Sequence, residues 1–265
     1  MFKLSFHSIG HVVVRNYMSF RNLFKISIVP NLIDPLFYLL AMGFGVGAYL
    51  THVNGMLYRD FVITGLIAAT AMSAATAETT VNAFIQYKIE KTYDAMLMTP
   101  INTNDIVVGQ AIWAGIRAVI FGGIFWLISM LITAHFHVLM LLIPLILFIV
   151  GYLFGVLGLI FTYLAPSREF LNYYNVLVIR PLYMFSDTFF PITSLPPILG
   201  DLTWFSPLYH ATRMIRIIWG GEVTGLYLHL IWLIALALLI TVLPIICYIV
   251  DIIDSLIICD VVVIF

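Results

Sequence analysis

Residues 118 to 167 decide the fold class, because the stretch AVIFGGIFWLISMLITAHFHVLMLLIPLILFIVGYLFGVLGLIFTYLAPS holds no Asp, Glu, Lys or Arg in fifty positions. One membrane-crossing helix needs about 20 mostly apolar residues, so this run is too long for a single crossing. The polar break AHFH at 134–137 divides the run in two. We therefore predict two membrane spans, at about 106–133 and 138–164, joined by a turn.

The composition of the whole chain indicates the same class of protein. Of its 265 residues 63% are hydrophobic and 9% are charged, and the mean hydropathy is +1.09. Globular domains are about half apolar and about a quarter charged, so we predict an all-α polytopic membrane protein. The net charge of −1 offers no basic surface for nucleic acid. The N-terminus lacks the pattern of a removable signal peptide.

Four further long apolar windows bring the predicted number of spans to six. They lie at about 30–50, 60–82, 171–190 and 223–250, each about the length that a spanning helix needs. We expect residues 1–265 to form a single transmembrane domain.

Lysine and arginine concentrate on one side of this arrangement. Seven of them flank the spans on the side of the N-terminus, against three on the other side. This excess predicts that the N-terminus, residues 83–105 and the loop at 165–170 face the cytoplasm from the cell inner membrane. An even number of spans returns the C-terminus to the same side. The tail 251–265 fits this side less well, because it carries three acids and no base.

Residues 1–27 are too polar to span a membrane, and we predict an amphipathic helix that lies in the membrane interface. At about 100° per residue, apolar side chains fall on one side of the helix and polar ones on the other, as in helices that bind at lipid headgroups. The apolar side holds Val13, Tyr17, Phe20 and Phe24, and the polar side holds His11, Arg15, Asn22 and Lys25.

Residues 191–222 join the fifth and sixth predicted spans and are apolar, aromatic and rich in proline. Proline disrupts the interior of a helix, so the four prolines of this segment exclude one continuous spanning helix. Broken backbone at membrane depth is stable only inside protein or along a cavity. We therefore predict a re-entrant pair of short helices on the external side.

Five ionisable residues lie in or beside the predicted spans, where an unpaired charge costs on the order of 3 kcal/mol. At a rise of about 1.5 Å per residue, Glu78 and Arg117 lie at compatible depths, and we predict that they pair. Arg180 faces either an anionic head group in a transport pathway or a structural partner, such as a carboxylate or the carbonyls freed by the following proline. Asp34 is expected to cap the first span. Asp187 lies near the external end of the fifth.

Motifs of ATP hydrolysis and of common hydrolases are missing from the sequence. It contains no G-x-x-x-x-G-K-[ST], H-E-x-x-H or G-x-S-x-G, so we predict no catalytic residue, and ATP would have to be bound by another polypeptide. His135 and His137 are poorly spaced for one metal ion and have no carboxylate or cysteine nearby, so we predict no metal site. The G-x-x-x-G pattern from Gly151 to Gly155 predicts close helix packing.

One polar island interrupts the apolar chain: QYKIEKTYDAMLMTPINTNDIVVGQ, residues 86–110. It predicts a short helix against the membrane, open to the cytoplasm. Its AMLMTP segment, followed by a polar turn and by GQ, resembles the membrane subunits of the type 2 ATP-binding cassette export family. The segment FFPITSLPPILGDLTWFSPLYHATRMIR at 189–216 resembles the same family. Within that family the chain is similar to permeases related to nodulation-factor exporters and to multidrug or lipid-saccharide exporters.

The resemblance implies a six-span half-transporter that forms a homodimer and binds two copies of a separate ATPase subunit. That partner would bind ATP and magnesium, and this chain would hold no cofactor. Residues 83–105 would form the coupling region that contacts the ATPase. The coupling residues carried over are Gln86, Lys88, Glu90, Lys91, Asp94, Thr99 and Pro100; the pathway candidates are Glu78, Arg117, Arg180 and Asp187; the external gate candidates are Phe189, Phe190, Pro191, Pro196, His210 and Arg213.

Asp187 departs from the family pattern, in which a small residue follows the serine, and it leaves the chemistry of the gate open. The leading hypothesis is an exporter permease for an amphipathic molecule, such as a lipid-linked saccharide, a lipid or a lipophilic drug. One alternative is an ion- or proton-coupled transporter, which the intramembrane carboxylates favour. The other is a membrane-embedded enzyme that modifies lipids. The sequence leaves the cargo and the direction of transport open.

Overall fold

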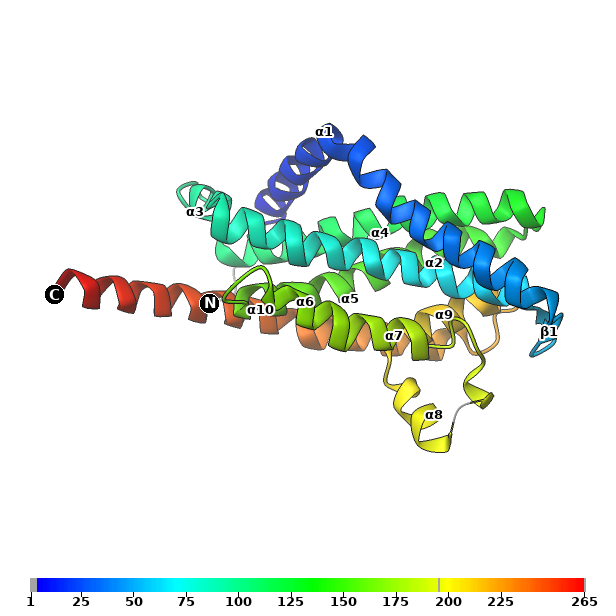
Figure 1. Cartoon of the computed structure of the whole chain (residues 1–265). Helices are drawn as coiled ribbons and strands as arrows, with labels where there is room; N and C mark the ends of the chain where they lie inside the picture. Colours follow the sequence, from blue (N-terminus) through cyan, green and yellow to red (C-terminus); the bar gives the residue numbers. More distant parts are fainter. Residues whose placement is uncertain (1–3, 195, 265) are drawn as a thin grey trace.

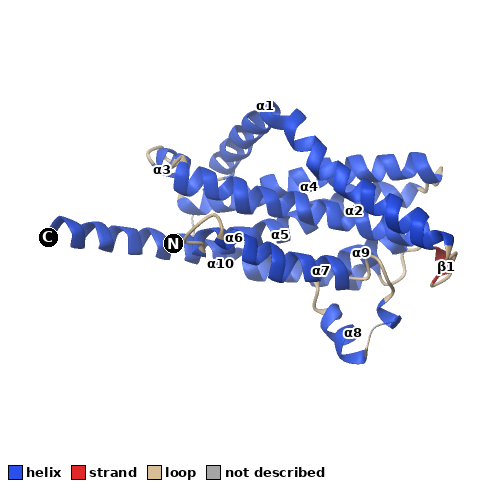
Figure 2. Ribbon diagram, in the orientation of Figure 1, coloured by secondary structure: helices blue, strands red, loops and turns tan. Residues whose placement is uncertain are grey.

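The computed structural model describes residues 4–194 and 196–264. Within them the chain is almost wholly helical, and Figure 2 shows strand only in one small hairpin. The long helices lie side by side along a common axis (Figure 1), with α3 (Thr92–Leu97) at one end and the hairpin of β1 (His52–Val53) and β2 (Met56–Leu57) at the other. We call these the α3 end and the hairpin end.

The first helix, α1 (Phe6–Tyr38), is longer than the sequence predicted. We expected a separate helix over 1–27, whereas the structure has one helix that bends sharply, so that its first arm leaves the bundle axis (Figure 1). Asp34 therefore lies inside α1, and its predicted role as a helix cap was wrong; Ser5 is the N-cap. A π-helical segment (Leu39–Gly45) and a short 3₁₀ turn continue α1 to the hairpin end.

The first arm of α1 lies against α4 (Thr103–Thr133) through a stripe spaced three or four residues apart. The side of α1 that packs on α4 is rotated from the apolar side predicted from the sequence. Tyr17, on that predicted side, is 52% exposed. The rotation follows from the helix that it meets, because Val12 fits against Gly109 of α4 and leaves no room for a larger side chain there. The buried stripe is Ile9, Val12, Asn16 and Phe20.

The hairpin owes its tight turn to an Asn-Gly pair. Asn54 has a φ of 50° and Gly55 a φ of 83°, which are the left-handed values that a two-residue hairpin turn requires. The chain then enters α2 (Tyr58–Ala77), which π-helical segments η3 (Glu78–Asn82) and η4 (Ile85–Ile89) prolong to the α3 end.

α2 is the central helix of the bundle. Every residue from 61 to 72 is buried, and α2 contacts α1, α4, α5 (Ile143–Leu164) and α9 (Pro207–Trp219). α4 and α5 approach each other closely, because a Cβ on Gly151 would lie 2.2 Å from the Cβ of Ala118, and one on Gly155 would lie 2.7 Å from that of Ala114. The predicted close packing at the G-x-x-x-G pattern is confirmed.

The predicted fifth span appears as a shorter helical run. α6 (Phe170–Tyr174), a π-helical segment (Asn175–Ile179) and α7 (Arg180–Phe185) form it. Its sixteen residues reach about 24 Å, less than the apolar thickness of about 30 Å. After a turn, α8 (Pro197–Trp204) projects sideways, α9 returns into the bundle, and α10 (Leu226–Ile264) runs back past the α3 end (Figure 1). Two short helices thus occupy the segment 191–222.

Five helices in the described part of the chain are long and apolar enough to cross a membrane. The run from Phe170 to Phe185 is not among them. The five are Ser27–Ala48, Tyr58–Ile89, Thr103–Thr133, Val138–Leu164 and Leu226–Val250.

Candidate functional site

The polar island forms α3 and the turns on either side of it. Lys91 has a φ of 49°, and this left-handed residue reverses the chain between η4 and α3. An apolar cavity of about 290 Å³ lies between α3 and the first arm of α1, and Val12, Met96 and Ile101 are among its walls. Of the predicted coupling residues, the structure exposes Lys88, Glu90, Lys91, Asp94, Thr99 and Pro100 and buries Gln86.

Four buried tyrosines hold α3 against the bundle. Tyr93 of α3 lies with its ring centroid 5.6 Å from that of Tyr87 and 6.1 Å from that of Tyr248 on α10. Tyr163, at the end of α5, completes the group at 4.8 Å from Tyr248 and 5.5 Å from Tyr87. Aromatic pairs at such separations stabilise beyond the area that they bury. We call these four residues the tyrosine cluster.

Glu78 and Arg117 form a buried ion pair, as predicted from their depths. Trp113 donates a hydrogen bond of 2.9 Å from Nε1 to one carboxylate oxygen of Glu78, and Asn82 donates to the other at 2.6 Å. The guanidinium of Arg117 also faces the ring of Phe20 on α1, at 5.1 Å. A polar cavity of about 210 Å³ lies beside the pair. The Glu78 pair therefore joins α1, α4 and the extension of α2.

A chain of amides continues from this pair to the first arm of α1. Gln110 donates to Gln86 at 2.9 Å and accepts from Asn16 at 3.0 Å, and Arg15 donates to Gln86 at 2.8 Å. These bonds satisfy polar groups that would be costly to bury alone. Gln86 thus lies inside the bundle, where its side chain bonds to Arg15 of α1 and to Gln110 of α4.

The start of α4 is fixed to the start of α1. Asn102 and Asp105 form a capping box, and the backbone N–H of Ser5 donates to Asp105 at 2.9 Å. Such reciprocal bonds satisfy the free N–H groups of a helix start. The first arm of α1 is therefore held at both its N-terminus and its buried side.

A second buried ion pair joins Asp187 to Arg216 near the hairpin end. Arg216 also donates to the backbone carbonyls of Asp187 at 2.8 Å and Phe61 at 3.3 Å, and its guanidinium lies 3.8 Å from the centre of the Phe61 ring. Arg213, a gate candidate, approaches Asp187 at 3.5 Å but keeps 36% of its side chain exposed. The Asp187 pair joins the turn after α7 to α9 and α2.

The turn after α7 is strained and closely packed. Asp187 has a φ of 61°, which is unfavourable for a residue with a Cβ. The next residue, Thr188, lies so close to Gly65 of α2 that a Cβ at position 65 would be 2.8 Å from the Cα and carbonyl oxygen of Thr188. Tyr58 donates to the carbonyl of Phe189 at 3.1 Å. These contacts hold the turn against α2.

The aromatic gate candidates differ in exposure. Phe189 is buried, with its ring 5.6 Å from that of Tyr38 on α1 and 5.3 Å from that of Tyr183 on α7. Phe190 and Pro191 are half-buried, and Pro196 is exposed. The contact between α1 and α7 at the hairpin end is thus aromatic.

His210 faces the protein interior. Its Nε2 lies 2.7 Å from the carbonyl oxygen of Trp204, which can only accept, so Nε2 carries the proton. Its Nδ1 then accepts from Nδ1 of His229 on α10, at 2.7 Å. Burial lowers the pKa of His210 to about 4. Within the described residues no group of three His, Cys, Asp or Glu side chains is placed to hold a metal ion.

Arg180 and Asp34 are both exposed on the surface of the single chain. In the part of the chain that the structure describes, neither forms a hydrogen bond or an ion pair. The intrachain structural ion pair considered for Arg180 is therefore not formed.

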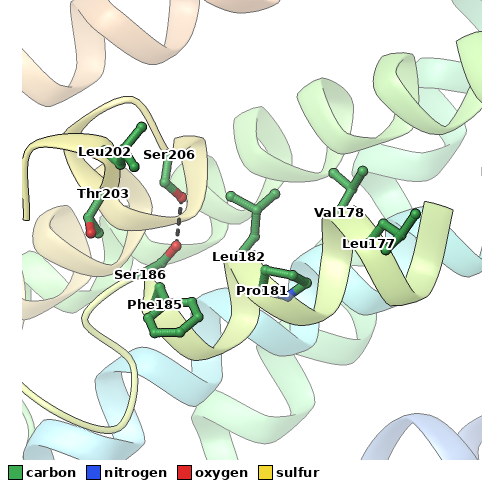
Figure 3. Close-up of a pocket in the computed structure, with 9 residues that line it drawn as sticks. All are labelled: Leu177, Val178, Pro181, Leu182, Phe185, Ser186, Leu202, Thr203 and Ser206. Carbon is green, nitrogen blue, oxygen red and sulfur yellow. Dashed lines mark hydrogen bonds between the residues drawn. The ribbon is translucent and has the colours of Figure 1, made fainter. Parts of the chain in front are cut away.

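An apolar pocket of about 370 Å³ lies between α7 and α8 (Figure 3). Leu177, Leu182 and Phe185 are among its apolar walls. At one end the hydroxyls of Ser186 and Ser206 meet at 2.6 Å (Figure 3), which fastens the end of α7 to the N-cap of α9.

Three of the residues that organise these sites were not predicted from the sequence. Arg216 is one of the three basic residues counted on the external side, and that count does not show that it is the main partner of Asp187. Gln110 and Asn16 lie in otherwise apolar surroundings, and their amide groups were the available signal that a buried network exists.

The chain is similar to known membrane transport proteins. The family model of the ABC-2 type transporter matches residues 7–219. Nodulation protein J of Rhizobium leguminosarum bv. viciae is 37% identical over 82% of this chain and 84% of its own length. Nodulation protein J of Rhizobium meliloti (strain 1021) is 35% identical, over 82% and 83%. The inner membrane transport permease YadH of Escherichia coli (strain K12) is 24% identical, over 72% and 74%. The chain therefore belongs to the ABC-2 type transporter family and is a multi-pass membrane permease subunit.

Proposed function

We propose that this chain is the membrane subunit of an exporter that moves an amphipathic molecule, such as a lipid-linked saccharide, a lipid or a lipophilic drug, across the inner membrane. A separate ATPase subunit would bind ATP and magnesium and drive the transport. The observation that carries the proposal is the segment from Lys88 to Leu97, which exposes four charged residues before and within α3 while the buried Tyr93 fixes α3 to the bundle. That is the form expected of a helix that receives force from a partner.

The α3 end would face the cytoplasm, together with the N-terminus and the C-terminus. Two copies of the chain would assemble with two copies of the ATPase. The apolar cavity between α3 and α1 supports docking there, because it offers a socket for an apolar side chain beside the charges of α3. The names of the relatives support a transport permease in an inner membrane and a role in nodulation for some members.

The buried carboxylates favour this function over proton-coupled transport. Glu78 and Asp187 each form a buried ion pair with an arginine, whereas the proton-coupled alternative rests on isolated carboxylates. A lipid-modifying enzyme would need a nucleophile, a base and an orienting group close together. Neither ion pair has such an arrangement around it.

The test of the ATPase partnership removes the four exposed charged residues that precede α3 or lie within it. The chain is purified together with the ATPase that associates with it. A fourfold variant changes Lys88, Glu90, Lys91 and Asp94 together to alanine. We expect the ATPase to be lost from the complex, or its stimulated turnover to disappear. The matched control changes Asp201 and Glu222, two exposed acids near the hairpin end, and should leave both unchanged. Turnover that survives the fourfold change would refute this site of coupling.

The sixth crossing is tested by labelling. We propose that the run from Phe170 to Phe185, with the turn that follows it, crosses the membrane, and that α8 and α9 form the re-entrant segment. Cysteines at positions 168 and 222 would then lie on opposite sides. In intact cells an impermeant thiol reagent should label Glu222→Cys and spare Arg168→Cys. Equal labelling of both would leave only five crossings.

A further inference from the structure

The short helix α3 has one fully buried side chain, while Met96 and Leu97 are partly buried against the same apolar cluster. Of its six residues, from Thr92 to Leu97, Tyr93 alone is buried, and its exposed fraction is 0%. The ring of Tyr93 contacts Tyr87 on the same chain segment and Tyr248 on α10. Ring contacts therefore connect α3 directly to α10.

The Glu78 pair does not offer an equivalent connection. Its partners lie on α1, α4 and the extension of α2, and none of them belongs to α3. The capping box at Asp105 lies after α3 and holds α4 to α1. The tyrosine cluster is thus the buried contact through which α3 reaches a distant helix.

The same helix, α10, reaches the short helices near the hairpin end. His229 lies about 28 Å along α10 from Tyr248, and Trp232 about 24 Å, by the rise of an α-helix. His229 bonds to His210 of α9 at 2.7 Å, and Trp232 stacks on His210 with ring centroids 4.1 Å apart. Trp204 of α8 also contacts Trp232, at 6.1 Å. α10, which contains Pro244 between the two regions, therefore has ring contacts with α3 on one side of that proline and with α8 and α9 on the other.

We propose that Tyr93 is the positioning residue through which α3 drives α10, and that α10 carries the displacement to α8 and α9. This inference rests on the proposed function, since it needs an ATPase that moves α3. Rigid helices transmit small displacements because packed side chains are not continuously deformable. The coupling between ATP hydrolysis at the α3 end and movement near the hairpin end therefore depends on the ring of Tyr93.

The test measures movement near the hairpin end without knowledge of the cargo. Cys247 and Cys259 are replaced by serine, and nitroxide labels are attached to Tyr49→Cys and Leu202→Cys, at two exposed positions. The distance between the labels is measured in the complex with its ATPase, with and without ATP and vanadate. We expect ATP to shift this distance in the parent protein. Tyr93→Ala should bind the ATPase and hydrolyse ATP but lose the shift.

Conservative and matched variants separate transmission from folding. Tyr93→Phe keeps the ring and should keep the shift, and Tyr173→Ala, at an exposed tyrosine of α6, should also keep it. If Tyr93→Ala fails to bind the ATPase, Tyr248→Ala decides, because that residue lies on α10 and away from the docking face. Loss of the shift in Tyr248→Ala supports the proposal, and its retention overturns it.

The two levels of the proposal fail in different ways. A parent complex that contains no ATPase would overturn both the proposed function and this inference. A parent complex that hydrolyses ATP and shifts, beside a Tyr93→Ala complex that shifts equally, would overturn this inference alone.

Discussion

The two buried ion pairs differ in what surrounds them. Glu78 begins the π-helical segment η3 and Arg117 lies within α4. Trp113 and Asn82 donate hydrogen bonds to Glu78, and a polar cavity lies beside the pair. Asp187 instead lies in a left-handed turn, and Arg216 also donates to two backbone carbonyls and to the hydroxyl of Thr64. One pair joins helices that would form without it. The other holds an irregular turn whose conformation depends on the pair.

This difference teaches where the molecule is brittle. Loss of one partner in a buried pair leaves an uncompensated charge, at a cost of about 3–5 kcal/mol. Where water can reach the remaining charge, the cost falls toward that of a lost hydrogen bond, about 1–3 kcal/mol. The region of the Asp187 pair should therefore be more sensitive to substitution than that of the Glu78 pair.

The largest effect is expected at Arg216. Arg216→Ala leaves Asp187 charged and buried and removes the bonds to two carbonyls, so we expect a loss of about 3–5 kcal/mol. Thermal unfolding of the purified protein in detergent measures it. Arg213→Ala is the matched control and should cost less than about 1 kcal/mol, because Arg213 is partly exposed. The double variant Asp187→Leu with Arg216→Met should recover much of the loss.

A smaller loss is expected at Glu78. Glu78→Gln removes the charge but keeps an acceptor for Trp113, and water in the adjacent cavity can solvate Arg117. We expect a loss of about 1–3 kcal/mol in the same unfolding measurement. The exchange of both charges, Glu78→Arg with Arg117→Glu, should be more stable than either single exchange. A loss at Glu78→Gln as large as that at Arg216→Ala would contradict the role of the cavity.

Acid should weaken the region around His210. The folded state holds the pKa of His210 near 4, below the ordinary value of 6.5, so the unfolded chain binds the proton more readily. Stability should therefore be constant above about pH 6.5 and should fall as the pH drops from 6.5 toward 4. His210→Gln cannot be protonated, so its unfolding midpoint should change less with pH in this window than that of the parent protein. An equal slope in the variant would contradict the assignment.

The smallest effect is expected at Ser206, the N-cap of α9. Its hydroxyl accepts from the N–H of Tyr209 at 3.3 Å and meets Ser186 at 2.6 Å. Ser206→Ala should cost about 1 kcal/mol, as for other lost helix caps. Ser206→Thr keeps the hydroxyl and serves as the control in the unfolding measurement. A variant as unstable as Arg216→Ala would place the main support of α9 here instead.

Regular helices made part of this structure predictable. Glu78 and Arg117 lie on long apolar helices, so a count of residues gives their depth, and the ion pair confirms it. The glycines of α5 likewise fit the predicted close packing. The pairing of Asp187 with Arg216 could not be predicted, because it depends on the direction of an irregular turn and on how far α9 enters the bundle.

The site at the α3 end was predictable in part for the same reason. The exposed charges of α3 follow from a polar segment between apolar ones. The tyrosine cluster does not, because it gathers rings from segments as distant as Tyr87 and Tyr248, and no local pattern records that contact. The helix run 1–27 was predicted to end early, because local composition cannot show that α1 continues past a change in polarity.

The contact between Gly65 and Thr188 limits how this chain can vary among its descendants. Position 65 has no space for a side chain, since a single methyl group would meet backbone atoms at 2.8 Å that no rotamer change can move aside. Any other residue at position 65 would add a Cβ, so the close contact between α2 and the turn requires glycine there.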